Sequence, residues 1–182
     1  MRKAIRACGL ALALGAIGTL SWAQDKVIRI GVLVPQSGPA SYFGSQVKQG
    51  MDLALEQLNK TGVNGYKFVL QVEDSACSPL QATNLAKKLV EEFKPQAMVG
   101  EWCSDAALAM APVVEAAKIP TVNVSSATGK LTESGYKEVF RIFPTADMQN
   151  VRLAEGATKS LKAKTAVVLY EKTNAGLDNA TS

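Results

Sequence analysis

The sequence contains no histidine. Histidine is the general base of most serine and cysteine nucleophiles and a frequent ligand of zinc. Its absence excludes Ser-His-Asp and Cys-His catalysis, and with them most zinc sites. An enzyme of this composition would need a carboxylate or a lysine as its base. We therefore expect no resident metal, and the search for function turns to binding.

A strong charge of either sign is also missing once the first 23 residues are set aside. The whole chain carries a formal net charge of +4. Arg2, Lys3 and Arg6 lie in residues 1–23, which hold no acidic side chain, so 17 basic side chains remain against 16 acidic ones. A nearly neutral chain has no electrostatic footprint for nucleic acid. We expect no nucleic-acid partner.

Residues 1–23 have the features of a secretory signal peptide. A basic start is followed by an apolar run from Gly9 to Leu20 and by Ser-Trp-Ala before the polar Gln24, as in an A-x-A-like cleavage site. A membrane anchor is the less favoured alternative, because the run is shorter than the ~20 residues that a span needs. We expect cleavage and export to the periplasm.

Two cysteines, Cys77 and Cys103, follow the expected cleavage site. An even number of cysteines in an exported chain favours a disulfide. Two buried free thiols are the alternative. A bridge would close a loop long enough for the chain-entropy model to assign it about 3.5 kcal/mol.

Apolar runs and helical patterns alternate along the rest of the chain. Runs typical of buried parallel strands lie at 27–34, 66–72, 96–100, 121–124, 139–143 and 165–170. Helices are expected at 42–60, from Pro79 after an N-cap at Ser78, at 104–118 and at 148–161. This alternation predicts a three-layer α/β/α fold around a doubly wound parallel sheet.

Doubly wound sheets bind ligands at the carboxyl ends of their strands. Four loops leave those ends, at 35–44, 73–79, 101–105 and 125–130. The first loop lacks the G-x-G-x-x-G spacing of dinucleotide sites, and Gly129-Lys130 is followed by Leu131, which excludes a phosphate-binding P-loop. We expect no cofactor.

Ser104 lies where a strand ends and a helix begins. One interpretation is an ordinary N-cap serine. The other is a carboxylate site, made by the hydroxyl and by free N–H groups at the positive end of the helix. Asp105 is expected to point outward as a first-turn acid.

The loop at 125–130 offers complementary groups. Ser125, Ser126 and Thr128 carry hydroxyls and carbonyls that suit an ammonium group, and an ordinary Ser/Thr turn is the alternative. Tyr42 and Phe43 could form a wall against an apolar ligand or belong to the core.

Several motifs together resemble the N-terminal part of type 1 periplasmic binding proteins. The closest branch is the leucine/isoleucine/valine-binding one, which serves branched-chain amino acid ABC transporters. The resemblance covers about Val27 to Val168. The motifs are SGPASYFG (37–44), DSACSPLQATNLAKKLV (74–90), VGEWCSDA (99–106), SSATGKLTESGY (125–136) and VFRIFPT (139–145).

The resemblance implies roles for the residues around the third strand. Cys77 and Cys103 match the family's disulfide. Ser104 matches the serine that holds the ligand carboxylate through its hydroxyl and N–H. Trp102 and Cys103 match neighbours that line the pocket, although a smaller apolar residue is common at the position of Trp102.

Other matches lie in the remaining loops. Ser126 and Thr128 match residues whose carbonyl and hydroxyl hold the amino group, and Ser125 adjoins them. Phe43 replaces an aromatic residue, usually tyrosine, that covers the pocket. The segment at Gly129-Lys130 is one residue short of the usual one, and Asn174-Ala175-Gly176 stands where a tyrosine often precedes glycine.

The resemblance implies an extracytoplasmic solute-binding receptor, not an enzyme. We expect a monomer that delivers an amino acid to an ABC transporter permease in the inner membrane. One alternative is a different small ligand, such as an amide, urea or an aromatic acid. Another is a hydrolase that uses Cys103 or Ser104, for which no histidine base exists.

The expected organisation is a signal peptide at 1–23, an N-terminal ligand-binding lobe at 24–143 and the start of a second lobe at 144–182. The resemblance implies a longer second lobe, so we expect a fragment. Leu153, Leu161 and other apolar side chains after residue 144 should then be exposed. We expect no amino-acid binding tighter than about millimolar, or about 4 kcal/mol.

Overall fold

The computed structural model describes residues 26–181. The expected signal peptide lies outside these residues. Within them, no helix combines the length and the apolar character needed to cross a membrane.

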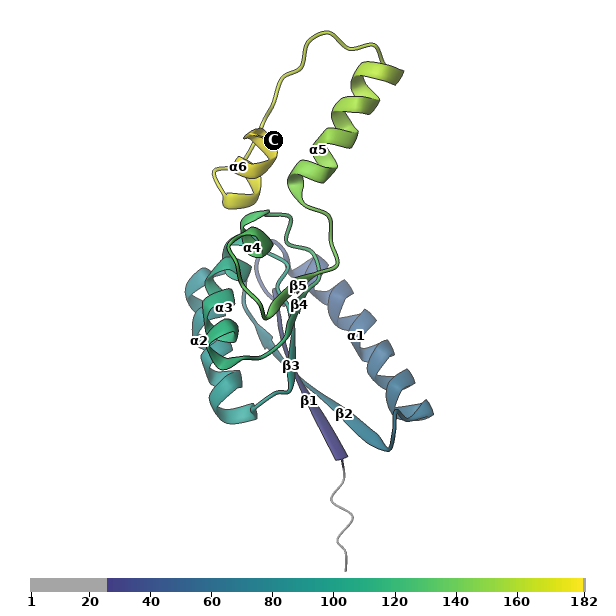
Figure 1. The fold of residues 1–182 in the computed structure, drawn as a ribbon, viewed down its shortest axis with the longest axis vertical. Helices are drawn as coiled ribbons and strands as arrows, with labels where there is room; N and C mark the ends of the chain where they lie inside the picture. Colours follow the sequence, from purple (N-terminus) through teal and green to yellow (C-terminus); the bar gives the residue numbers. More distant parts are fainter. Residues whose placement is uncertain (1–25, 182) are drawn as a thin grey trace, which may run out of the picture.

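A five-stranded parallel sheet forms the centre of the molecule (Figure 1). Its strands are β1 (Lys26–Val34), β2 (Tyr66–Asp74), β3 (Ala97–Gly100), β4 (Thr121–Asn123) and β5 (Val139–Arg141). They lie in the order β2-β1-β3-β4-β5, with every pairing parallel. The chain moves outward from β1 in both directions, so a topological switch point lies between β1 and β3. The predicted doubly wound sheet is confirmed.

Helices cover both faces of the sheet (Figure 1). One face carries α1 (Ser41–Thr61), and the other carries α2 (Pro79–Lys88), the π-helical turn η1 (Leu89–Phe93) and α3 (Ser104–Ala117). The predicted start of α2 is confirmed, because the Ser78 side chain accepts a hydrogen bond from the Gln81 N–H at 3.3 Å ahead of Pro79.

The remaining helices lie at or beyond the carboxyl ends of the strands (Figure 1). They are α4 (Lys130–Glu133), α5 (Ala146–Glu155), η2 (Gly156–Ser160) and α6 (Asn174–Thr181). Thr145 caps α5 by accepting a hydrogen bond from the Met148 N–H at 3.1 Å, so this helix begins two residues earlier than predicted.

The hydrophobic core lies between the sheet and the α2/α3 layer. Its fully buried members include Leu33, Leu89, Met98, Ala106 and Val114. Alanines at the inner face of α3 permit close approach to the sheet, because a short side chain keeps the two backbones near each other.

The strand predicted at 165–170 is wrong. These residues form no regular element, and Val167 and Leu169 are about nine-tenths exposed, at 88% and 92%. A strand needs a neighbour that satisfies its N–H and C=O groups, and no strand of the described chain pairs with this run. The exposure expected for Leu153 and Leu161 is confirmed, at 72% and 80%.

Candidate ligand-binding site

A cavity of about 500 Å³ lies at the carboxyl ends of β3 and β4. Three of the four predicted loops reach it, and the segment that leads into α6 forms part of its wall. The lining residues are Cys77, Trp102, Cys103, Ser104, Asp105, Ser125, Ala127, Phe143, Glu171, Thr173 and Ala175. The topological switch point of the sheet and the cavity thus lie at the same edge.

Ser104 is the first residue of α3, and the N-cap is Cys103, whose backbone is extended. The N-cap interpretation of Ser104 is therefore wrong. Ser104 is only 6% exposed, and its hydroxyl has no hydrogen-bond partner among residues 26–181. The first backbone bond of α3 runs from the Ala107 N–H to the Cys103 carbonyl at 2.9 Å. The N–H groups of Ser104, Asp105 and Ala106 are the free donors of the helix end, where an anion is favoured.

Asp105 does not point outward, contrary to the prediction from its first-turn position. Its Oδ1 accepts hydrogen bonds from the backbone N–H of Asn174, at 3.3 Å, and from the Asn174 side-chain amide. The carboxylate is therefore engaged by the start of α6, and does not stand free beside Ser104.

An aromatic pair adjoins the cavity. The rings of Phe43 and Trp102 are stacked, with centroids 4.5 Å apart and an interplanar angle of 11°. Phe43 is 44% exposed and Tyr42 is 68% exposed, so neither belongs to the core. Phe43 stacks on Trp102, which lines the cavity, but Phe43 itself is not a lining residue, so its role as a wall against a ligand stays a prediction.

The three hydroxyl residues of the 125–130 loop are placed differently from one another. Ser125 lines the cavity, and its Oγ is buried without a partner in the described chain. Thr128 is fully buried, its Oγ1 is also unpartnered, and it lies outside the cavity lining. Its carbonyl accepts a hydrogen bond from Arg141 Nη1 at 2.7 Å.

Ser126 is a structural link between loops. Its Oγ donates to the Glu101 carbonyl at 3.0 Å and accepts from Asn123 Nδ2 at 2.9 Å. Its carbonyl, which the resemblance assigns to an ammonium group, accepts from Arg141 at 3.4 Å. Asn123 Nδ2 also donates to the Glu101 carbonyl at 2.9 Å, so the ends of β3 and β4 are joined by side chains.

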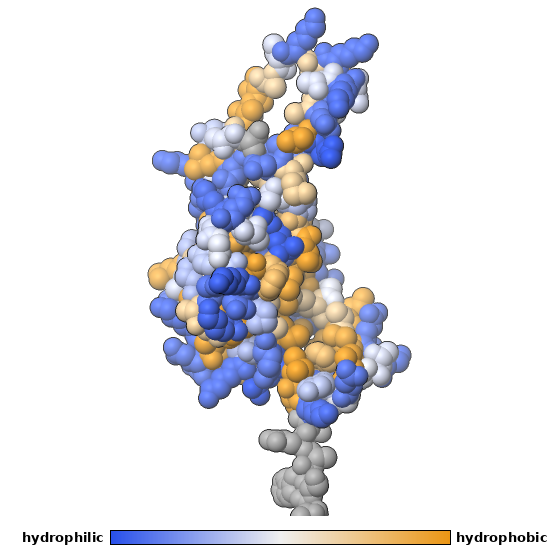
Figure 2. Space-filling view, in the orientation of Figure 1, coloured by the Kyte–Doolittle hydropathy of each residue, from blue (hydrophilic) through white to orange (hydrophobic). Residues whose placement is uncertain are grey.

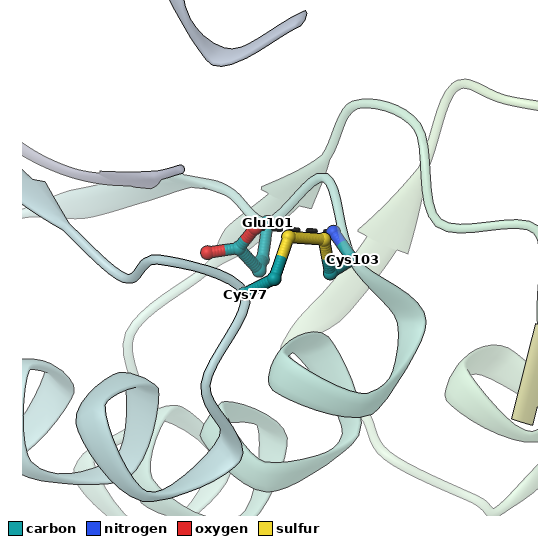
Figure 3. A group of neighbouring side chains, drawn as sticks. All are labelled: Cys77, Glu101 and Cys103. Carbon is teal, nitrogen blue, oxygen red and sulfur yellow. Dashed lines mark hydrogen bonds between the residues drawn. A yellow bond between two sulfur atoms is a disulfide. The ribbon is translucent and has the colours of Figure 1, made fainter. Parts of the chain in front are cut away.

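Cys77 and Cys103 form a disulfide, as predicted, with their Cα atoms 5.4 Å apart (Figure 3). That separation is typical of disulfides. The bridge joins the segment before α2 to the N-cap of α3. It thereby constrains the loop that carries Trp102, which lines the cavity.

Glu101 is a residue of the site that the sequence analysis missed. It is fully buried beside the disulfide, and its Oε1 accepts a hydrogen bond from the Cys103 N–H at 3.1 Å (Figure 3). The same oxygen accepts a second hydrogen bond, from the Trp102 N–H, at 2.6 Å. Burial raises the pKa of this carboxyl, while the Ser75 side chain and the two backbone N–H groups act in the opposite direction. Its Oε2 has no partner within the described residues. The one sequence signal was a charged residue directly after a buried strand.

The sulfurs of Cys77 and Cys103 and a carboxylate oxygen of Glu101 lie within 4.8 Å of one another. Such a trio has the ligand types of a metal site. Both sulfurs are bonded to each other, however, and a metal binds the thiolate. The oxidised chain therefore uses this group to shape the loop.

Comparison with known proteins agrees with this architecture. Residues 27–182 match the periplasmic binding protein family. An amino acid binding protein of Pseudomonas aeruginosa is 34% identical over 176 residues, which is 96% of this chain and 47% of the relative. A leucine-, isoleucine-, valine-, threonine- and alanine-binding protein of the same species is 31% identical over 172 residues, or 94% of this chain and 46% of the relative.

Solved structures show the same fold. A leucine binding protein from Thermotoga maritima superposes with a TM-score of 0.79 at 30% identity, covering 84% of this chain and 43% of that one. A solute binding protein from R. palustris in complex with 4-hydroxybenzoate gives 0.77 at 30% identity, with 86% and 42% covered. The chain spans about half the length of these relatives. With the family match extending from β1 to the end of α6, the chain belongs to the periplasmic binding protein family.

Proposed function

We propose that this chain binds the carboxylate end of a small solute as part of an extracytoplasmic receptor for an ABC transporter. One observation carries the proposal. The unpartnered hydroxyl of Ser104 and the free N–H groups of the first turn of α3 lie at a cavity of about 500 Å³. A helix N-terminus attracts a carboxylate through these donors and through its positive dipole end.

The ligand class that we propose is an amino acid with an apolar side chain, of the branched-chain type. The Trp102–Phe43 stack supplies an apolar surface near Ser104. The unpartnered Ser125 Oγ offers an acceptor for an ammonium group. The names of the P. aeruginosa relatives point in the same direction.

An aromatic carboxylic acid is the second candidate. A stacked tryptophan and phenylalanine suit a flat ring, because aromatic pairs gain from offset stacking. The R. palustris neighbour, which is in complex with 4-hydroxybenzoate, supports this alternative. The two candidates share the carboxylate and differ in the ammonium group.

A hydrolase built on Cys103 or Ser104 is not what we propose. The thiolate is the nucleophile of cysteine enzymes, and the Cys103 sulfur is held in the disulfide. The sequence has no histidine to activate Ser104. We propose a monomeric periplasmic binding protein whose partner is a permease in the inner membrane.

Backbone NMR of the chain tests the proposal. Leucine and 4-hydroxybenzoate are titrated through the millimolar range, because Glu171 on the far wall of the cavity is exposed and charged contacts there stay hydrated. We expect saturable shifts of the Ser104 and Asp105 amides with one of the two ligands. The dissociation constant should be about millimolar, or about 4 kcal/mol.

The substitution Ser104→Ala is the decisive variant. It should weaken binding by roughly 1–3 kcal/mol, because a charged acceptor loses its partner. Ser160→Ala, on the exposed turn η2, is the matched control and should change nothing. Unchanged affinity after Ser104→Ala, or shifts that avoid the cavity, would contradict the proposal.

A further inference from the structure

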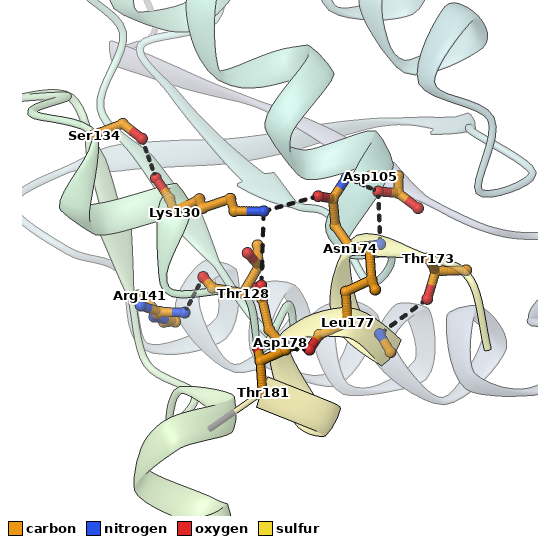
Figure 4. Close-up of polar contacts among 11 residues, drawn as sticks. Asp105, Thr128, Lys130, Ser134, Arg141, Thr173, Asn174, Leu177, Asp178 and Thr181 are labelled. Atoms are coloured by element: carbon orange, nitrogen blue, oxygen red, sulfur yellow. Dashed lines mark hydrogen bonds and ion pairs between the residues drawn. The ribbon is translucent and has the colours of Figure 1, made fainter. Parts of the chain in front are cut away.

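Asn174 lies between two charged side chains of the site. Its backbone N–H donates to Asp105 Oδ1 at 3.3 Å, and its side-chain amide donates to the same oxygen (Figure 4). Its Oδ1 accepts a hydrogen bond from Lys130 Nζ at 3.1 Å. We call Asp105, Asn174 and Lys130 the latch.

The latch joins three separate parts of the cavity wall. Asp105 follows Ser104 in the first turn of α3, and Lys130 begins α4, two residues after Thr128. Asn174 begins α6, in the segment whose Glu171, Thr173 and Ala175 line the cavity. One side chain thus connects both loops that we assign to the ligand with the segment that faces them.

Asparagine has the chemistry that this position requires. Its amide donates to a carboxylate and accepts from an ammonium at the same time, which neither a carboxylate nor an apolar side chain does. Hydrogen bonds to charged groups are stronger than those between neutral groups. Asp105 and Asn174 are half-buried, so water screens their contact less than it screens the exposed Lys130.

The segment itself has a fixed conformation behind the latch. The Thr173 hydroxyl accepts a hydrogen bond from the Gly176 N–H at 3.0 Å and so caps the start of α6. A Cβ atom at Gly176 would lie 2.0 Å from the Glu171 carbonyl oxygen. The turn from 171 to 176 is therefore tight, and holding Asn174 holds the lining residues with it.

We propose that Asn174 is a positioning residue of the binding site, which holds residues 171–176 as the far wall of the cavity and thereby slows escape of the ligand. This proposal rests on the proposed function, because it gives the wall a ligand to retain. Other contacts hold the later part of α6: Lys130 Nζ lies 3.7 Å from Asp178 Oδ1, and Asn150 Nδ2 donates to the Asn179 carbonyl at 3.0 Å. Asn174 acts at the start of the helix, next to the lining residues, although it does not line the cavity itself.

Hydrogen exchange without ligand tests the latch directly. Asn174→Ala removes the side-chain links to Asp105 and Lys130, and we expect the amides of residues 174–181 to exchange about 10-fold faster, the ratio for a loss of about 1.4 kcal/mol. Asn59→Ala is the matched control. Asn59 also makes two hydrogen bonds, to the N–H and carbonyl of Phe68 at 2.8 and 2.9 Å, and lies near the opposite end of the sheet.

A charge exchange separates the latch from general damage to the fold. Asn174→Asp places a second carboxylate beside Asp105, so exchange should be faster than in Asn174→Ala. Adding Asp105→Asn restores the pair with its roles exchanged, because the amide at position 105 can donate to the carboxylate at position 174. That carboxylate can still accept a hydrogen bond from Lys130. We expect the double variant to recover most of the protection.

The affinity is measured for whichever of leucine and 4-hydroxybenzoate binds the wild-type chain. Asn174→Ala should weaken the binding of this ligand about 10-fold through a faster off-rate, with Ser104 unchanged. Unchanged exchange in Asn174→Ala overturns the latch, and faster exchange with unchanged affinity overturns the positioning role. Binding of neither probe to the wild-type chain overturns the proposed function and with it the positioning role, while exchange still decides whether the latch exists.

Discussion

The two faces of the sheet differ in how completely they are packed. On the α2/α3 face, side chains from β1, β3, α2, η1 and α3 form one fully buried cluster. On the α1 face, the only fully buried residue of the helix is Gly44. A cavity of about 300 Å³ lies between α1 and the sheet, lined by apolar side chains that are visible in Figure 2.

The difference in packing follows from the number of helices that cover each face of the sheet. The packed face has two helices in contact with each other, and the disulfide joins the start of one to the start of the other. The other face has a single helix, whose row of apolar residues is interrupted by Gly50 where it faces the sheet. An amphipathic pattern orients a helix, but filling the space beneath it needs a second element. The candidate ligand site lies at the edge of the packed face.

The largest expected effect tests the disulfide of the packed face. Replacing both Cys77 and Cys103 by alanine should reduce the free energy of unfolding by about 3.5 kcal/mol, because the 26-residue loop is no longer closed in the unfolded chain. Urea unfolding with and without a reducing agent measures it. Reduction should lower the stability of the wild-type chain and leave the double variant unchanged. Equal stability of the wild-type chain and the double variant in the absence of reducing agent would refute the expectation.

A pair of leucines compares the two faces directly. Leu89 is fully buried in the core cluster beside β1, whereas Leu55 is half-buried and lines the α1 cavity. Leu89→Ala should cost about 3 kcal/mol, because a new void opens in a filled core. Leu55→Ala should cost about 1 kcal/mol or less, because space is already present there. Equal losses in thermal or urea unfolding would show that the faces are packed alike.

Two glycines sharpen the comparison within α1. A Cβ at Gly44 would lie 1.8 Å from the Pro35 carbonyl oxygen, whereas a Cβ at Gly50 meets nothing within 4 Å. Gly44→Ala should destabilise by about 2 kcal/mol, since α1 must shift away from the loop. Gly50→Ala should stabilise by about 0.5–1 kcal/mol through helix propensity. Calorimetry of both variants measures the change in stability, which should be negative for Gly44→Ala and positive for Gly50→Ala. A change of the same sign in both variants would be inconsistent with the structure.

The smallest effect is a pH dependence from the buried carboxyl at the site. Burial raises the native pKa of Glu101 above its unfolded value of about 4.3. The native state then binds more protons than the unfolded state between these two pKa values. Stability from this group is therefore fully present below the unfolded pKa and is lost as pH rises through the native pKa. Glu101→Gln should remove that slope from unfolding curves taken across the window.

Glu115 provides the control of opposite sign. Its pKa is lowered, chiefly by the Glu138 N–H that it accepts at 2.9 Å. Its contribution is present above the unfolded pKa and is lost as pH falls through the native one. Glu115→Gln should therefore change the slope in the other direction. A wild-type slope that survives Glu101→Gln would exclude Glu101 as its source.

Much of the fold and part of the site follow from local patterns. Alternating apolar runs and helical spacing predicted the order and approximate bounds of β1 to β5 and of α1 to α3. The expected export and the even number of cysteines after the expected cleavage site predicted the Cys77–Cys103 pair. The loops at carboxyl ends of strands gathered four of the predicted site residues in one cavity, namely Trp102, Cys103, Ser104 and Ser125.

The errors share one physical cause. The apolar run at 165–170 predicted a strand. A strand forms only where a neighbouring strand satisfies its backbone N–H and C=O groups, and a local sequence pattern does not show whether such a neighbour is present. Asp105 was predicted to point into solvent because acidic residues in the first turn of a helix usually do. Its contact with Asn174 is 69 residues away in the sequence, so no local pattern could indicate it. Glu101 was overlooked because nothing local distinguishes a buried carboxylate from an exposed one.

The sequence by itself determined the periods of the elements, the edge of the sheet where the loops meet, and the absence of a histidine-based chemistry. Those properties depend on side-chain spacing and composition, which are local. Only the tertiary structure decided that Ser104 is free while Asp105 is engaged, that Phe43 lies on Trp102, and that Asn174 joins two distant loops. These are contacts between segments that the chain brings together only when its core forms.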